Sequence, residues 1–350
     1  MQAFFPERTG QHAPAFEVVE GGQRVPYTDA SERVACVVAA LQAQRLAVAR
    51  PAPAWDLALL SGLHAPDYLQ FLRTAFVDWQ QAAAAYGWSV DTPLVPALSA
   101  PRRPLPGRGH ALRSVFARAG YYLLDLAAPI TEGTWTAAVD SAGCAVAAAQ
   151  AVVAGQRAAV AVCRPPGHHA GRDFAGGFCY LNNAALAAQV LRMHFGQTVA
   201  VIDIDYHAGH GTQDLFYERS DVWTLSLHAD PTWEYPFFSG YADEVGEGPG
   251  RGCHRNVPLP QGIDDAGYAL ALKDGLSWVA TGRPAALVIS AGLDLYIDDP
   301  VGRFAITRAG IAQIGAQLAA LRLPTVLVLE GGYHLPTLGE NLAALAAAFA

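Results

Sequence analysis

Two stretches of this sequence place side chains that bind metal ions directly after runs of apolar residues. In VAVIDIDYHAGHG, residues 199–211, the apolar run leads into Asp205 and His207. These residues are two positions apart, so in an extended backbone both side chains point to the same side and can bind one cation. The second run, in AALVISAGLD, ends at Asp294. Because the carboxyl ends of parallel strands meet at one edge of a sheet, the pattern predicts a metal site there, with Asp294 as its third ligand.

Adjacent histidines, His168 and His169, follow another apolar run in the segment RPPGHHA. A neutral imidazole can take a proton from water, and a protonated neighbour can stabilise negative charge or donate a proton to a leaving amine. Alone, the pair would suit a surface loop or further metal ligands. Its position at a strand end beside the Asp/His pair favours acid–base chemistry.

A tyrosine follows two glycines in EGGYH, after the apolar run 325–329. The glycines allow a sharp turn, on which the phenol of Tyr333 could donate a hydrogen bond to a reacting carbonyl. Packing of the ring on the turn is the alternative, and these residues alone do not decide between the two.

An aromatic segment, DFAGGFCYLNN, could form a slot for a linear substrate. Gly176 and Gly177 permit close approach of the backbone, and Phe178 and Tyr180 supply flat walls that exclude water from an aliphatic stem. Ordinary core packing is an equal alternative for Tyr180, whereas we favour Phe178 as a wall.

The elements that must position these residues alternate along the chain, as in a parallel sheet covered by helices. We expect a single α/β domain over residues 1–350, because neither a linker nor a repeat divides the sequence. The expected strands are 158–163, 199–204, 222–227, 286–290 and 325–329. The expected helices are 135–154, 182–194, 264–280, 307–321 and 338–349, with weaker helical signal at 31–44 and 65–86, and with Thr307 as a helix cap.

One segment interrupts this alternation. Residues 87–109 contain five prolines and almost no periodic pattern. A loop of this length is either a mobile surface insertion or a functional arm that shapes a substrate entrance or a subunit contact.

Composition excludes several classes of protein. With 52% hydrophobic and 15% charged residues, the chain is globular, and its net charge of −8 without a basic run argues against nucleic-acid binding. The first residues do not resemble a signal peptide, and no uninterrupted apolar stretch is long enough to span a membrane, so we expect a cytoplasmic protein without a membrane partner. The five cysteines are scattered, which predicts reduced thiols and argues against a zinc knuckle.

Taken together, the motifs resemble the histone deacetylase superfamily of zinc amidohydrolases. The resemblance rests on RPPGHHA, AGGFCYLNNAA, DIDYHAGHGTQ, SLHADP, SAGLD and EGGYH, which occur in the family's order between Trp135 and the C-terminus. Within the superfamily the chain is most similar to bacterial acetylpolyamine amidohydrolases, because of PFFSGYADEVGEGPGRG, EGTWTAA, the glycines near residue 21 and the proline-bearing insertion. This resemblance implies the arginase/deacetylase fold, with an eight-stranded, mostly parallel sheet.

The resemblance also implies roles for the residues of the site. Asp205, His207 and Asp294 would bind one Zn²⁺. His168 and His169 would be the acid–base pair, with His169 as general base, Tyr333 would polarise the acetyl carbonyl, and Asp203 would hold His168 from behind. The tunnel residues implied are Gly177, Phe178 and, less clearly, Tyr235. Monovalent K⁺ or Na⁺ would bind at two places, one near Asp203, Asp205, His207, Ser226 and Leu227, and the other around Phe216, Arg219 and Val222.

Two positions depart from the pattern of the family. Ala208 stands where relatives commonly carry a second histidine, and His210 stands where they carry Asp or Asn behind His169. An imidazole cannot raise the pKa of that base as a carboxylate would, so we expect a lower pKa for His169 and an altered activity or substrate set.

The expected substrate is an acetylated polyamine or a related small acetylated amine. Such a cation needs acidic groups near a narrow entrance, for which Glu17 is the leading candidate, followed by Glu20, Asp91 and Glu132, although a solvated surface carboxylate is the commoner explanation for any one of them. Deacetylation of acetyl-lysine in proteins, a ureohydrolase with two manganese ions, and a catalytically weak binding protein for acetylated amines are the alternatives. The ligands would also fit Fe(II) or Co(II). A homodimer through the insertion would restrict access to slender substrates.

Overall fold

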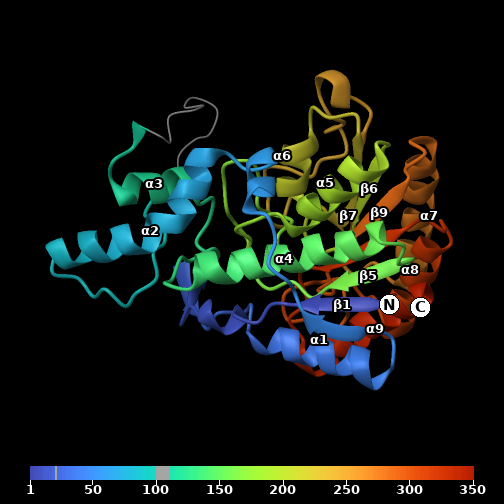
Figure 1. Ribbon diagram of the computed structural model, residues 1–350, viewed down its shortest axis with the longest axis horizontal. Coiled ribbons are helices and arrows are strands. Elements are labelled where there is room, and N and C mark those ends of the chain that lie inside the picture. Colours follow the sequence, from blue (N-terminus) through green and yellow to red (C-terminus); the bar gives the residue numbers. More distant parts are fainter. Residues whose placement is uncertain (20–21, 100–110) are drawn as a thin grey trace.

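An eight-stranded parallel sheet, covered by helices on both faces, forms the centre of the protein (Figure 1). The computed structural model describes residues 1–19, 22–99 and 111–350. The strands run in the order β4-β1-β5-β10-β9-β6-β7-β8, and the neighbouring pairs are parallel. Their bounds are β1 (Gln2–Phe5), β4 (Val48–Pro51), β5 (Ala158–Ala161), β6 (Val199–Asp203), β7 (Val222–Ala229), β8 (His254–Leu259), β9 (Ala286–Ala291) and β10 (Thr325–Leu329). The predicted single-domain α/β fold is confirmed.

Apolar residues on both faces of the central strands explain why helices pack on each side. Val199 and Val201 of β6 belong to one apolar cluster, whereas Ala200 and Ile202 belong to the other, because successive side chains of a strand point to opposite faces. The first cluster includes residues of α2 (Pro66–Ala85), α3 (Val115–Tyr122), α4 (Thr134–Val153) and α5 (Asn183–Phe195). The second includes residues of α1 (Glu32–Ala43), α7 (Asp265–Thr281), α8 (Arg308–Ala319) and α9 (Leu335–Ala346).

Shorter elements complete the fold outside the main sheet. An antiparallel pair consists of β2 (Glu17–Val19) and β3 (Gln23–Val25), and α6 (His210–Phe216) follows β6. The remaining elements are short 3₁₀ helices: η1 (Thr9–Gln11), η3 (Leu57–Gly62), η5 (Gly248–Gly250) and η6 (Ala347–Phe349).

Helix α4 has the length and apolar composition of a membrane span, the one such helix in the described part of the chain. Of its most apolar window, 72% is buried inside the protein. It lies against α5 and β5, so its apolar residues are explained by the core.

The five expected strands are present, each with ends within two residues of the prediction. Thr307 caps α8 as predicted, because its hydroxyl accepts a hydrogen bond from Gly310 N at 3.2 Å. The last helix begins at Leu335 rather than at 338, since Pro336 lies in its first turn, where proline needs no hydrogen-bond partner. The prediction located neither the strands β1, β4 and β8 nor the helices α3 and α6.

The proline-bearing segment is partly described. Leu94 and Ile130 form a short antiparallel bridge, with hydrogen bonds of 2.8 and 2.9 Å, and the indole of Trp79 donates to Thr92 O at 2.8 Å. The first part of the segment is therefore attached to the body of the protein. Residues 100–110 lie outside the described residues.

Candidate active site

The predicted site residues follow four adjacent strands of the sheet. The strands β5, β10, β9 and β6 are neighbours and parallel, so their carboxyl ends lie at the same edge. The loop after β5 carries His168 and His169, and the loop after β10 carries Tyr333. Asp294 follows β9, and Asp205 and His207 follow β6. This arrangement brings together residues that are far apart in the sequence.

Asp205, His207 and Asp294 form a compact group of potential metal ligands, whose ligand atoms all lie within 4.8 Å of one another. The Nδ1 atom of His207 is 3.2 Å from Asp205 Oδ1 and 3.1 Å from Asp294 Oδ2. Asp294 Oδ2 is buried, and the contact with His207 Nδ1 is the one polar contact found for it among the described residues. Two carboxylates and one imidazole that converge in this way form a donor set that fits a divalent metal ion.

The other oxygens of the two carboxylates are held by backbone groups. Gly331 N donates to Asp205 Oδ2, and Tyr206 N donates to Asp294 Oδ1, each at 2.9 Å. Burial and the charge of Asp205 raise the pKa of Asp294 to about 7. Burial lowers the pKa of His207, but the carboxylates of Asp205 and Asp294 outweigh burial and raise this pKa to about 10. The two carboxylates therefore attract positive charge to this position.

The tandem histidines lie in opposite electrostatic surroundings. His168 Nδ1 is 3.0 Å from Asp203 Oδ2, and despite burial the charges of Asp205 and Asp203 raise the pKa of His168 to about 10. Burial lowers the pKa of His169 well below its ordinary value, and His168 and His210 lower it further. The surroundings therefore favour the protonated form of His168 and the neutral form of His169. Such a separation is what an acid–base pair requires.

His210 lies where the sequence analysis placed it, behind His169. The two Nδ1 atoms are 3.1 Å apart, and the ring of His210 stacks on that of Phe174 at 5.6 Å. The predicted direction of the His169 pKa is confirmed, although burial is its largest cause.

The turn that carries Tyr333 is built around two glycines. A Cβ on Gly331 would lie 2.4 Å from Asp294 Oδ2, and Gly332 has a φ of +118°, which side chains disfavour. The turn therefore runs directly over the metal-ligand group. Burial raises the pKa of the Tyr333 phenol well above its ordinary value, which keeps it protonated as a hydrogen-bond donor.

Aromatic side chains line the approach to these groups. The ring of Phe178 lies 5.6 Å from that of Tyr333, and the ring of Tyr235 lies 4.9 Å from that of His169. Gly177 is required beside them, because an added Cβ would lie 2.4 Å from the ring of His169. Tyr180, in contrast, is a core residue: it is fully buried and its hydroxyl donates to Pro129 O at 2.6 Å.

Several charged residues of the site escaped the sequence analysis. Glu330 Oε2 accepts hydrogen bonds from Gly167 N at 2.6 Å and His168 N at 3.1 Å, so it holds the histidine loop. Asp125 Oδ2 accepts from Tyr235 Oη at 2.7 Å and Gly177 N at 2.8 Å, and so joins two parts of the aromatic lining. Burial raises the pKa of both carboxyl groups, to about 7 for Glu330. An acidic residue directly after the apolar strand 325–329 was the available signal for Glu330.

Of the candidate acidic residues, Glu17 alone is buried among those described. Its side chain is 2% exposed, it accepts a hydrogen bond from Thr28 Oγ1, and its Oε2 atom is buried without a hydrogen-bond partner among the described residues. Asp91 and Glu132 are exposed, as the surface alternative predicted, and Glu20 lies outside the described residues.

The residues suggested for monovalent cations lie near β6 and β7. Ser226 is paired with Asp203 in the register of the two strands, and its hydroxyl contacts His228 Nδ1 at 2.7 Å. Leu227, Phe216 and Val222 are buried. The guanidinium of Arg219 is occupied by Asp221, at 2.9 and 3.0 Å, so only its backbone could face an ion.

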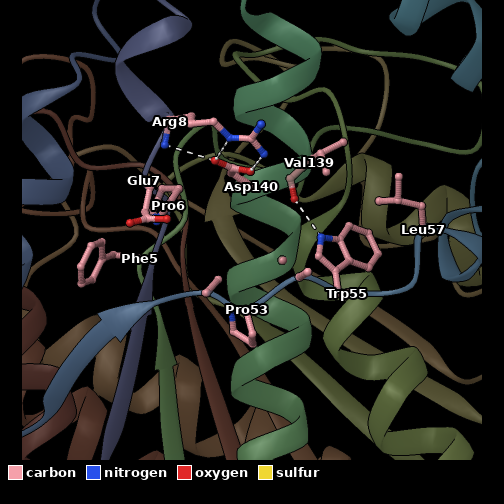
Figure 2. A pocket seen from close by; sticks show the side chains of 12 residues that line it. Phe5, Pro6, Glu7, Arg8, Pro53, Trp55, Leu57, Val139 and Asp140 are labelled. Atoms are coloured by element: carbon pink, nitrogen blue, oxygen red, sulfur yellow. Dashed lines mark hydrogen bonds and ion pairs between the residues drawn. The ribbon is translucent and has the colours of Figure 1, made fainter.

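A separate hollow of about 360 Å³ lies between α4 and the residues that follow β1 and β4 (Figure 2). Two of its charged residues are paired with each other: Arg8 Nε donates to Asp140 Oδ2 at 2.9 Å. Trp55 Nε1 donates to Val139 O at 3.1 Å and closes one side of it. None of the candidate site residues lines this hollow.

Comparison with known proteins agrees with this geometry. The histone deacetylase domain matches residues 27–349. Acetylpolyamine amidohydrolase 1 of Pseudomonas aeruginosa is 41% identical over 94% of this chain and 93% of its own, and the acetylpolyamine amidohydrolase of Burkholderia pseudomallei is 42% identical over 97% and 96%. A crystal structure of acetylpolyamine aminohydrolase from Burkholderia pseudomallei superimposes with a TM-score of 0.92, 40% identity and coverage of 100% of this chain and 98% of that one. The chain therefore belongs to the histone deacetylase family, as its motifs and its arginase/deacetylase-like fold indicated.

Proposed function

We propose that this hydrolytic deacetylase cleaves acetylated polyamines or related small acetylated amines, with one Zn²⁺ held by Asp205, His207 and Asp294. The observation that carries the proposal is geometric: the buried His168, paired with Asp203, and the adjacent His169 lie beside a compact group of three potential metal ligands. The similarity to acetylpolyamine amidohydrolases over nearly the whole chain supports the substrate class.

The residues would divide the reaction among them. When bound, Zn²⁺ would act as a Lewis acid on the acetyl carbonyl and increase the acidity of water. His169 takes the proton as water attacks the carbonyl carbon, and Tyr333 donates a hydrogen bond to the carbonyl oxygen as negative charge develops there. Asp203 keeps His168 protonated, and the histidine pair then gives a proton to the leaving nitrogen. The products are acetate and a free amine.

The experiment that tests the substrate class compares kcat/KM for N-acetylputrescine with that for an acetyl-lysine peptide. A higher value for N-acetylputrescine supports the proposal. A higher value for the peptide would assign the protein to acetyl-lysine deacetylation, and tight binding of either compound without release of acetate would indicate a binding protein.

Glu17 is proposed to bind the distant ammonium of the substrate. Burial raises its pKa to about 7, and Asp29 and Asp125 act in the same direction, whereas the hydrogen bond from Thr28 opposes it. Glu17 is therefore neutral below pH 7 and charged above it. We expect KM for N-acetylputrescine to fall about tenfold as the pH rises from 6 to 8, since an ion pair replaces a neutral contact.

The matched variant is Glu17→Gln, which stays neutral throughout. In it, KM should be high at pH 6 and at pH 8. A KM that still falls with pH in this variant, or a wild-type KM that does not change, would exclude Glu17 as the ammonium ligand. An uncharged N-alkylacetamide serves as the control substrate, whose KM should not respond to Glu17.

We also propose a homodimer, through an exposed apolar patch near the start of the insertion. This patch comprises Tyr86 and Trp88, which are 64% and 52% exposed. The rings of Tyr86 and Trp88 stack at 4.9 Å, at the end of α2, which extends with α3 from one end of the body (left in Figure 1). Exposed apolar groups of this size are typical of a surface covered by another chain.

We expect light scattering to give a dimer for the wild type and a monomer for the Tyr86→Ser/Trp88→Ser double variant. Leu270→Ser is the control, because Leu270 is even more exposed (71%) but lies on α7. A monomeric wild type, or a double variant that remains dimeric, would show that this patch is not the interface.

K⁺ or Na⁺ at the two suggested sites and a cytoplasmic location stay predictions. The buried Asp203 beside Ser226 supports the first cation site. Stabilisation of the protein by KCl beyond that given by an equal concentration of tetramethylammonium chloride would test both cation sites together.

A further inference from the structure

A buried carboxylate binds the backbone of the turn that carries Tyr333. Asp299, in the loop after β9, is 7% exposed, and its Oδ2 atom accepts hydrogen bonds from Tyr333 N at 2.6 Å and His334 N at 3.0 Å. Its other oxygen, Oδ1, accepts from Val301 N at 3.0 Å. All three of these hydrogen bonds come from backbone N–H groups. Two of them hold the backbone of Tyr333 and His334.

A guanidinium holds the same turn from its carbonyl side. Arg33, on α1, is fully buried, donates from Nε to Gly332 O at 2.8 Å, and donates from Nη2 to Glu330 O. Its guanidinium carbon lies 5.0 Å from the centre of the Tyr333 ring. The backbone of this turn is therefore fixed on one side through its N–H groups by Asp299 and on the other through its carbonyl groups by Arg33.

The chemistry of the turn explains why a carboxylate is needed. Tyr333 and His334 directly precede α9, where the backbone N–H groups have no partner within the helix and the helix dipole favours negative charge. The preceding Gly332 has a positive φ, and the N–H groups of Tyr333 and His334 find their partner in Asp299. A single oxygen that accepts from two consecutive N–H groups sets the direction in which the Tyr333 side chain leaves the backbone.

We propose that Asp299 is a positioning residue for Tyr333: it fixes the backbone from which the phenol reaches the acetyl carbonyl. The proposal rests on the proposed role of Tyr333 in amide hydrolysis. A displacement of about 1 Å of a group that contacts the reacting atoms can cost about 10²-fold in rate, so the loss of this grip should reduce catalysis even though Asp299 touches no substrate.

Asp299→Asn tests the proposal, because it preserves size and removes one of the two accepting oxygens. We expect kcat for N-acetylputrescine to fall about 10- to 100-fold, with KM and bound metal unchanged. Asp298→Asn is the matched control: the neighbouring carboxylate is exposed, and its loss should leave kcat unchanged.

A double-mutant cycle with Tyr333→Phe separates positioning from general support of the fold. If Asp299 acts through the phenol, Asp299→Asn should lower kcat by less than about threefold in the Tyr333→Phe background. Equal losses in both backgrounds, or an unchanged kcat in the single variant, would overturn the proposal. Asp299→Glu, which keeps the charge and displaces it, provides a second variant for the same cycle, and failure of both variants to fold would assign Asp299 to the fold instead.

The activity of the wild-type protein separates a failure of the proposed function from a failure of the role proposed for Asp299. If the wild-type protein does not hydrolyse N-acetylputrescine or the acetyl-lysine peptide, the proposed function fails. If it does, and the cycle is additive, only the role of Asp299 fails.

Discussion

Replacement of Tyr333 by phenylalanine is expected to lower kcat for N-acetylputrescine by about 10²- to 10³-fold, with little change in KM. The expected size is that of a single lost hydrogen-bond donor to an oxygen that becomes negative in the transition state. Since the ground-state carbonyl carries little charge, the phenol contributes mainly to the transition state and the loss belongs in kcat. Steady-state kinetics at a saturating metal concentration measure both constants.

The expected result depends on the phenol being protonated, which its raised pKa ensures across the range in which the enzyme would be assayed. Tyr296→Phe is the control, because Tyr296 is a nearby tyrosine, with its ring 6.1 Å from that of His334, and lies outside the proposed mechanism. Unchanged amide hydrolysis by Tyr333→Phe would remove the phenol from the mechanism and leave the ring as a packing group against Phe178.

The metal-ligand group could be predicted from sequence because each ligand lies at a fixed, short distance from the end of an apolar strand. Asp205 and His207 follow β6, and Asp294 follows β9, which is its direct neighbour in the sheet. Parallel pairing then forces the two strand ends together, whatever the loops between them do. The family resemblance added roles to residues that this geometry had already made neighbours.

The groups that hold the site in place could not be predicted in the same way. Asp299, Asp125 and Glu330 act on backbone N–H groups, and a hydrogen bond to the backbone requires no particular side chain at the other end. Arg33 and Gly332, which it contacts, are 299 positions apart in the sequence. Apart from Glu330, which directly follows an apolar strand, such partners leave no pattern of spacing and are found only in the folded structure.

The same contrast applies to the fold. The central strands β6, β9 and β10 are buried throughout and consist mostly of apolar residues, with one polar residue in each, so their sequences stand out. The edge strands β4 and β8 are partly exposed and include Arg50, Pro51, His254 and Arg255, which resemble loop residues. A strand at the edge of a sheet is covered less, and its composition therefore carries less signal.

Replacement of Asp294 by asparagine is expected to remove the metal ion and, with it, activity, by at least about 10³-fold, because Lewis-acid catalysis contributes several kcal/mol. Asparagine can still accept the hydrogen bond from Tyr206 N through Oδ1, so the loop should keep its conformation, but it presents an uncharged amide in place of the carboxylate oxygen Oδ2 that faces His207. Metal analysis should give one zinc ion per wild-type chain and less than about one tenth of that in the variant after dialysis.

Thermal unfolding is a second way to measure metal binding, since a metal ion that binds only the folded chain stabilises it. Added Zn²⁺ should raise the Tm of the metal-free wild type and of Asp274→Asn, a control at an exposed ion pair with Arg255, but not that of Asp294→Asn. An active Asp294→Asn enzyme that retains its zinc would exclude Asp294 as a ligand. Two ions per wild-type chain would instead favour the two-metal chemistry of a ureohydrolase, in which the single group of Asp205, His207 and Asp294 could not be the whole metal site.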